Sequence, residues 1–217
     1  MKFNTGTFVP ARFNTNLSGI ESILDEMFPG ETADFLEIRD TKTQGLTGPL
    51  RIDDILSDDH GNFFKLIFDT GKKQTQVGAG GNWGFGKSVY YRVGMGIVVF
   101  YSRIKIEGGY ESRLIITLVE NEENPDAILA KINPRSAGKA WWGIKEGKDD
   151  FLPITDDELI LEILNVFGIP PFRPNETGTS IIIPYIDKQK LLKNIIPEEA
   201  SISDDIRARC TLSLIHI

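Results

Sequence analysis

The sequence predicts an α+β domain in which a β-sheet carries helices on one face. Three observations lead to this class: short runs of β-branched and aromatic residues, two amphipathic helical stretches, and strands and helices that follow no regular alternation. The chain has 217 residues, of which 41% are apolar, enough for one sizeable core. We therefore expect a single domain with at most a short overhang.

The first half of the chain is expected to contain two strands and two helices. Lys2–Val9 is a short run of β-branched and aromatic residues, which is typical of a strand. Leu17–Phe28 carries apolar residues at three-and-four spacing and is followed by Pro-Gly, which predicts an amphipathic helix and its end. Phe35–Arg39 indicates a short strand, and a helix is expected near Phe63–Phe68, within the glycine-rich stretch 40–88.

The middle of the chain predicts a β-hairpin. Ile97–Ile106 and Arg113–Val119 have the composition of strands, and the sequence between them, EGGYES, is a turn signal. The following stretch, 120–150, is polar, and we assign no element to it. It contains the pair Trp141–Trp142, which we interpret as packing or partner surface rather than as a ligand platform.

The last helix has the clearest signals. Thr155 to Glu158 match a capping box, and apolar residues follow at helical spacing up to Gly168. The start, the buried face and the end of one helix therefore agree. After this helix, Ser180–Ile186 predicts the final strand.

Charge and composition exclude several classes of protein. Lysine and arginine number 24 and aspartate and glutamate 31, a net charge of −7 that does not support a basic nucleic-acid groove. The longest apolar runs, such as Ile97–Phe100, are far shorter than the roughly 18 residues of a membrane span, so we expect a cytoplasmic protein. One cysteine, Cys210, excludes an internal disulfide, and two histidines, His60 and His216, leave little room for metal ligation. We expect no metal site in this chain.

The most informative segment is the glycine-rich loop GGNWGFGKS at residues 80–88. Gly81 to Ser88 match G-x-x-x-x-G-K-[ST], the P-loop in which backbone amides surround a phosphate, the lysine adds a charge and the serine holds Mg²⁺. A P-loop follows a buried strand, whereas residues 69–80, DTGKKQTQVGAG, are polar and glycine-rich. The context therefore argues against a P-loop nucleotidase, which stays as an alternative.

The same loop resembles the second glycine box of the GHKL (Bergerat-fold) ATPases, which include DNA gyrase, histidine kinases and the large heat-shock chaperones. That box has the form G-x-[FW]-G-x-G and opens a helix; GNWGFG fits it, and KSVYYRV would continue as the helix. Glycines permit a close approach of the backbone to phosphate, and the start of a helix favours an anion. We expect nucleotide contacts from Gly81, Trp83, Gly84, Phe85, Gly86, Lys87 and Ser88. Lys87 would point at phosphate in either loop, although the family has no fixed lysine there, and Trp83 could pack the lid or fill core space.

Two further segments resemble this family, in the family's order. Asp40, at the end of a predicted strand, matches the aspartate that accepts a hydrogen bond from the adenine amino group. In the common D-x-G-x-G form, glycines shape the base pocket; here Lys42 stands at the first glycine position and Gly45 comes late. Gly178-Thr179, before the last strand, resembles the family's Gly-Thr motif and implies that Thr179 lies near Asp40.

The resemblance covers most of the chain and implies the fold and ligand of the family. The fold would be a two-layer α/β sandwich with a mixed, mostly antiparallel sheet and helices on one face. The ligand would be ATP, with Mg²⁺ expected only in the full-length protein, and the function a nucleotide-driven conformational module of a larger prokaryotic protein. A downstream domain or a second copy of the chain would be its partner. Lys72 and Lys73 could reach the γ-phosphate from a lid, although a solvated loop is the plainer interpretation.

The E-x-x-x-N motif of the family's catalytic helix is not found. Glu21 and Asp25 have the i, i+4 spacing, but only 15 residues separate Asp25 from Asp40, too few for the rest of that helix and a further strand. We therefore interpret Glu21 and Asp25 as a solvated helix face and expect the catalytic residues before Met1. The chain as given is expected to show no magnesium-dependent ATP turnover.

These expectations divide the chain into three parts. Residues 1–187 would be the ATP-binding domain without its N-terminal catalytic helix, and 188–211 the start of a following region. The last six residues, LSLIHI at 212–217, resemble the translation of a sequencing adaptor, with an apolar terminal strand as the alternative. Besides an ATPase, a degenerate nucleotide-sensing domain without turnover and a histidine-kinase-like phosphotransferase stay open as functions.

Overall fold

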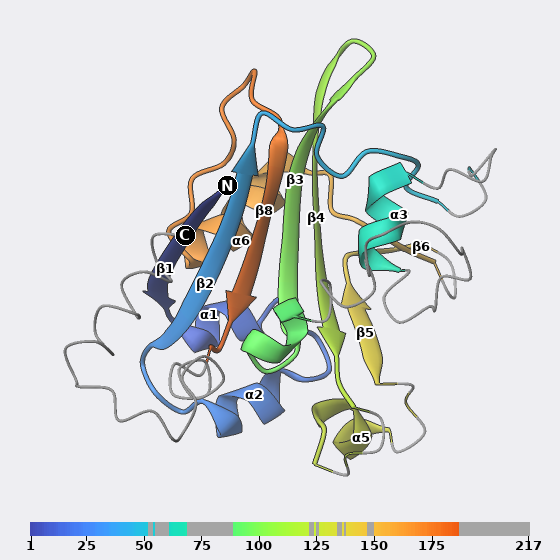
Figure 1. The fold of residues 1–217 in the computed structure, drawn as a ribbon. Helices are drawn as coiled ribbons and strands as arrows, with labels where there is room; N and C mark the ends of the chain where they lie inside the picture. Colours follow the sequence, from blue (N-terminus) through green and yellow to red (C-terminus); the bar gives the residue numbers. More distant parts are fainter. Residues whose placement is uncertain are drawn as a thin grey trace, which may run out of the picture.

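The protein is built around one six-stranded sheet in the strand order β1-β2-β8-β3-β4-β5 (Figure 1). The computed structural model describes residues 1–51, 54, 61–68, 89–121, 124, 126–133, 136, 138–146 and 150–186. Every strand pair within these residues is antiparallel. The strands of the sheet are β1 (Lys2–Phe8), β2 (Ala33–Thr41), β3 (Ile97–Ile106), β4 (Gly109–Val119), β5 (Lys139–Trp142) and β8 (Gly178–Pro184). A separate two-stranded sheet pairs β6 (Ile144–Glu146) with β7 (Asp150–Leu152).

The last strand of the described chain lies in the middle of the sheet. β8 pairs with β2 on one side and with β3 on the other, although about 140 residues separate it from β2 and about 75 from β3. Figure 1 shows β8 between these two strands, with the long β3–β4 hairpin beside it. Because β8 lies between β2 and β3, the residues near positions 40 and 178 of the sequence lie side by side.

The predicted hairpin is confirmed, but its turn is shorter than expected. Ile106 pairs with Gly109, so Glu107 and Gly108 alone connect the strands, and Gly108 has φ +85°. Two-residue hairpin turns need positive φ, which glycine adopts without strain. The ladder therefore continues through Tyr110 and Glu111, which we had placed in the turn.

Helices cover both faces of the sheet, not one face as predicted. The helices are α1 (Pro10–Asn14), α2 (Glu21–Met27), α3 (Gly61–Ile67), α5 (Ile128–Ile132) and α6 (Asp157–Val166). α1, α2 and α6 pack with Val99 and Tyr101 in the larger hydrophobic cluster. α3 packs with Val98 and Phe100 in a second cluster, together with residues from the helical stretch 89–93. Successive strand residues point to opposite faces, so these two clusters lie on opposite sides of one sheet.

The predicted helix Leu17–Phe28 is shorter in the structure. α2 begins at Glu21, and residues before it form consecutive turns, with Leu17 N–H donating to the Asn14 carbonyl oxygen at 2.8 Å. Gly19, with φ +94°, interrupts the helical conformation there. The helix α1 was not predicted; it begins with Pro10 at its first turn, a position where proline costs no hydrogen bond.

The capping of α6 differs by one residue from the prediction. Asp156, not Thr155, is the N-cap, and its carboxylate accepts from the backbone N–H groups of Glu158 and Leu159 at 2.9 and 3.0 Å. An aspartate cap also complements the positive end of the helix dipole. The helix ends before Gly168, which has φ +63°, as predicted.

The polar stretch 120–150 contains elements that the sequence analysis did not assign. α5 and β5 both lie in it, and β5 pairs with β4 by placing Trp142 opposite Ile116. The indole N–H of Trp142 donates to the Ser18 carbonyl oxygen at 3.0 Å, and the Trp141 ring lies 5.8 Å from that of Phe68. Both tryptophans therefore take part in packing, one of the two roles expected for them.

Candidate functional site

A pocket of about 620 Å³ opens on the face of the sheet that carries α3. Its volume is within the usual range for small-molecule sites. The strands β2 and β8, the segment after β2, the helix α3 and the helical stretch 89–93 all contribute to it. The lining residues are Met1, Ile38, Asp40, Thr43, Gln44, Gly45, Leu46, Asn62, Lys65, Leu66, Tyr90, Thr179 and Ile181.

A row of polar residues crosses four strands on the pocket face. Thr179 of β8 pairs with Asp40 of β2 on one side and with Ser102 of β3 on the other. Ser102 in turn pairs with Arg113 of β4. The next row on the same face is apolar and consists of Ile38, Ile181, Phe100 and Ile115. The pocket therefore has a hydrogen-bonding edge next to an apolar floor.

Asp40 and Thr179 form the part of this edge that faces the pocket. The Asp40 side chain is 47% exposed, and its Oδ1 atom lies 3.7 Å from the ammonium group of Met1. The Thr179 hydroxyl oxygen lies 3.4 Å from that of Ser102. Asp40 therefore keeps room to accept hydrogen bonds from a ligand.

The segment after Asp40 depends on residues in the left-handed backbone conformation. Lys42 has φ +62°, Gly45 φ +70° and Gly48 φ +110°. A Cβ atom on Gly45 would lie 2.6 Å from the Ser102 hydroxyl oxygen and 3.0 Å from the carbonyl oxygen of Arg103. Gly45 is thus required for space as well as for conformation, while Lys42 takes its conformation at a steric cost.

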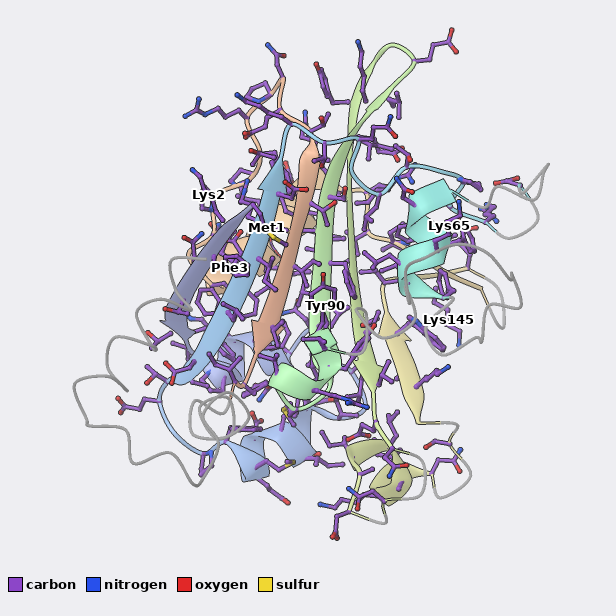
Figure 2. The ribbon with its side chains drawn as sticks, in the orientation of Figure 1. Met1, Lys2, Phe3, Lys65, Tyr90 and Lys145 are labelled. Atoms are coloured by element: carbon purple, nitrogen blue, oxygen red, sulfur yellow. The ribbon has the colours of Figure 1, made fainter. Side chains whose placement is uncertain are left out.

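The opposite wall of the pocket comes from Lys65 and Tyr90. Figure 2 labels these two residues together with Met1, and they come from three separate segments around the front of the sheet. Burial raises the pKa of the Tyr90 hydroxyl above its ordinary value. Lys65 lines the pocket from α3 and adds a positive charge to this wall.

The structure brings together three of the residues singled out in the sequence. Asp40, Gly45 and Thr179 all line the same pocket, and Asp40 and Thr179 are direct partners in the β2–β8 ladder. The glycine-box residues Gly81, Trp83, Gly84, Phe85, Gly86, Lys87 and Ser88 lie outside the described residues, as do Lys72 and Lys73. Tyr90, soon after the box, reaches the pocket.

Glu21 and Asp25 lie away from the pocket. Both side chains are exposed on α2, whose Leu24 belongs to the cluster on the other face of the sheet. The Asp25 carboxylate accepts from the Asn14 side-chain amide at 2.7 Å. The interpretation of Glu21 and Asp25 as a solvated helix face agrees with this position.

Sequence reasoning missed Ser102, Arg113, Lys65 and Tyr90. Ser102 directly follows the apolar run Ile97–Tyr101 and Arg113 directly precedes the apolar run Leu114–Ile116, so a polar residue next to a buried run is a signal that could have marked them. Lys65 and Tyr90 carry no such signal, because a lysine or a tyrosine on a short helix is common on any protein surface. Their place at the pocket follows only from the packing of α3 and of residues 89–93 on the sheet.

The comparisons with known proteins identify no relative. No family model, no curated protein and no solved structure matches the chain. Within the described ranges, no helix is long and apolar enough to cross a membrane. The same residues contain no group of three or more histidine, cysteine, aspartate or glutamate side chains that could hold a metal ion.

Proposed function

We propose that the protein binds an adenine nucleotide in this pocket, as the ATP-binding domain of a GHKL-type ATPase whose conformational change drives a larger prokaryotic protein. One observation carries the proposal. Asp40, Gly45 and Thr179, chosen from the sequence because they resemble two separate motifs of that family, line a single pocket. Asp40 and Thr179 are also paired across β2 and β8, although 139 positions separate them in the sequence.

The chemistry of the pocket edge suits adenine. A carboxylate accepts hydrogen bonds, and adenine offers an exocyclic amino donor where guanine offers a carbonyl oxygen. The apolar row beside Asp40, with Ile38 and Ile181 in the pocket lining, suits the face of a planar ring. In this arrangement the base lies over the apolar row and its amino group points to Asp40.

The phosphates would extend from the base towards α3. Lys65 on α3 supplies a positive charge in the described lining. Tyr90 belongs to the helical stretch 89–93, which follows the glycine box in the sequence and contributes to the same pocket. The proposal therefore assigns phosphate contacts to Gly81–Ser88, as the resemblance implies.

A P-loop nucleotidase fits the described sheet less well. P-loops connect a strand to a helix in α/β folds built on parallel strands. All strand pairs among the described residues are antiparallel, including both partners of β8. The antiparallel sheet favours the GHKL alternative for the glycine box.

A nucleotide-sensing domain without turnover is the second candidate. Asp40 is the one carboxylate among the described lining residues, and the proposal uses it for the base. Hydrolysis needs a general base close to the attacking water. No second acidic side chain in the described part of the pocket is available for that role.

Titration of the 217-residue chain with ATP and GTP tests the binding proposal. ATP should bind about tenfold or more tightly than GTP, since an acceptor facing an acceptor costs about 1–3 kcal/mol. Asp40→Asn should reduce this preference. Asp126→Asn is the control, because Asp126 is exposed beside α5 at the other end of the sheet. It should leave the affinities for ATP and GTP unchanged. Equal affinity for ATP and GTP in the unmodified chain would rule the proposal out.

Phosphate release in the presence of Mg²⁺ and ATP tests turnover. The chain as given should release no phosphate above background, because Glu21 and Asp25 lie on the other face of the sheet. The matched variant is Glu21→Gln. If the chain did release phosphate and Glu21→Gln abolished the release, α2 would carry the catalytic base. The nucleotide site would then lie elsewhere than in this pocket.

A further inference from the structure

The pocket wall formed by residues 43–48 is held by side chains from the sheet below it. This segment follows β2 and is not part of a strand, so its backbone groups need partners outside the ladder. Four of its residues, Thr43, Gln44, Gly45 and Leu46, line the pocket. The shape of the wall therefore depends on whatever satisfies their backbone.

Ser102 contacts this segment and β8 at the same time. Its hydroxyl oxygen accepts from the Leu46 N–H at 2.8 Å and donates to the Gly178 carbonyl oxygen at 2.8 Å. Ser102 is completely buried, so water cannot replace these bonds if the hydroxyl is removed. The close approach of Gly45 to the same hydroxyl places the whole wall directly on Ser102.

Arg113 holds the carbonyl groups of the segment. Its Nη1 atom donates to the carbonyl oxygens of Leu46 and Gly48 at 3.0 and 2.7 Å, and its Nε atom donates to Glu111 at 2.6 Å. The guanidinium carbon lies 5.8 Å from the centre of the Phe63 ring on α3. Because the planar guanidinium carries five fixed donors, one buried arginine links the wall, β4 and α3.

From this geometry we infer that Ser102 and Arg113 are positioning residues for ligand binding, which keep the wall at residues 43–48 in its bound shape before the ligand arrives. The inference rests on the proposed function for the identity of the ligand. A wall that is already ordered loses less conformational freedom on binding, which favours affinity. Removal of either residue should therefore weaken nucleotide binding although neither residue lines the pocket.

The hairpin supplies its own control for this inference. Arg103 and Ser112 form the neighbouring cross-strand pair, one position along from Ser102 and Arg113. They point to the other face, and Arg103 Nη1 donates to the Ser112 hydroxyl at 2.8 Å. Ser112 is 3% exposed, so Ser112→Ala removes a buried hydroxyl of the same kind without touching the pocket wall.

The experiment compares Ser102→Ala with Ser112→Ala, and Arg113→Lys with Arg103→Lys, in the full chain. Urea unfolding first shows which variants are folded. Hydrogen exchange of the Leu46 amide and the affinity for ATP are then measured.

Ser102→Ala should expose the Leu46 amide to faster exchange and weaken ATP binding about tenfold, because a buried donor loses its partner. Arg113→Lys keeps the charge but cannot reproduce the forked contacts, and should weaken binding about three- to tenfold.

The outcomes separate this inference from the proposed function. Faster Leu46 exchange in Ser102→Ala with unchanged ATP affinity would overturn the positioning role and leave ATP binding intact. Equal losses of affinity in the Ser112→Ala and Arg103→Lys controls would also overturn it, since the effect would then reflect general loosening of the hairpin. Failure of the unmodified chain to bind ATP would overturn the proposed function, and the positioning role with it. If Ser102→Ala does not fold, Arg113→Lys decides the question by the same two measurements.

Discussion

The two faces of the sheet are made by alternate residues of the same strands, yet they are covered to different extents. On one face, α1, α2 and α6 bury a cluster rich in aromatic rings; Phe8, Phe13 and Phe167 lie within 5.8 Å of one another by ring centres. On the other face, α3 and residues 89–93 cover part of the strands, and the pocket opens beside them. Both faces bury a hydrophobic cluster, and the second face also carries the pocket.

Glu37 and Asp40 show this difference on a single strand. The Glu37 side chain is 3% exposed on the covered face, where it accepts from Ser180 at 2.6 Å, Asn4 at 2.7 Å and Arg39 at 3.3 Å. The Asp40 side chain is 47% exposed on the pocket face. Two acidic residues of β2, three positions apart, thus differ in environment: Glu37 is satisfied within the protein, and Asp40 stays half exposed in the pocket lining.

Removing each carboxylate tests this contrast and should give the largest effect. Glu37→Ala should lower the free energy of unfolding by about 3–5 kcal/mol, because Arg39 would keep a buried charge without its partner. Asp40→Ala should change it by less than about 1 kcal/mol, since its ion pair with Met1 is half exposed. Urea unfolding of both variants provides the measurement. A similar cost for the two substitutions would contradict the division of the faces.

Gly45→Ala tests how closely the pocket wall approaches the sheet. Gly168 is the matched control for Gly45, because the two residues have similar φ values of +63° and +70°. A Cβ atom added to Gly168 would have no atom within 4 Å. Gly168→Ala should destabilise by about 1 kcal/mol from backbone strain alone. Gly45→Ala should cost about 2–3 kcal/mol, because the added methyl group also collides with the Ser102 hydroxyl. Equal melting temperatures for the two variants would show that the wall is looser than described.

Lys42→Gly should give the smallest effect, and a stabilising one. Lys42 has φ +62° where the GHKL first glycine box carries glycine, and its N–H donates to the Thr177 carbonyl oxygen at 2.8 Å. Glycine adopts this conformation without the steric cost, which should add about 0.5–1 kcal/mol to the free energy of unfolding. Thermal unfolding would detect the change. A loss of stability would mean that contacts of the Lys42 side chain stabilise the fold by more than its backbone strain costs.

Elements defined by neighbouring residues could be predicted from the sequence. The α6 helix followed from its apolar spacing and its terminal glycine, and the β3–β4 hairpin from two strand-like runs around a glycine turn. Asp40 was singled out through the family resemblance rather than from its local pattern, and it lines the pocket. The α5 helix and strand β5 were missed, since their five and four residues are too short to show a periodicity.

The tertiary structure alone decided which of these residues meet. β8 lies between β2 and β3, and no local pattern specifies such a pairing, because its stabilisation comes from contacts between distant segments. The partnership of Asp40 with Thr179 agrees with the family resemblance, but the row that continues to Ser102 and Arg113 depends on strand register. A shift of one residue would turn all these side chains to the other face. The sequence by itself therefore determined which residues have suitable chemistry, and the register of β8 determined that Asp40 and Thr179 line one pocket.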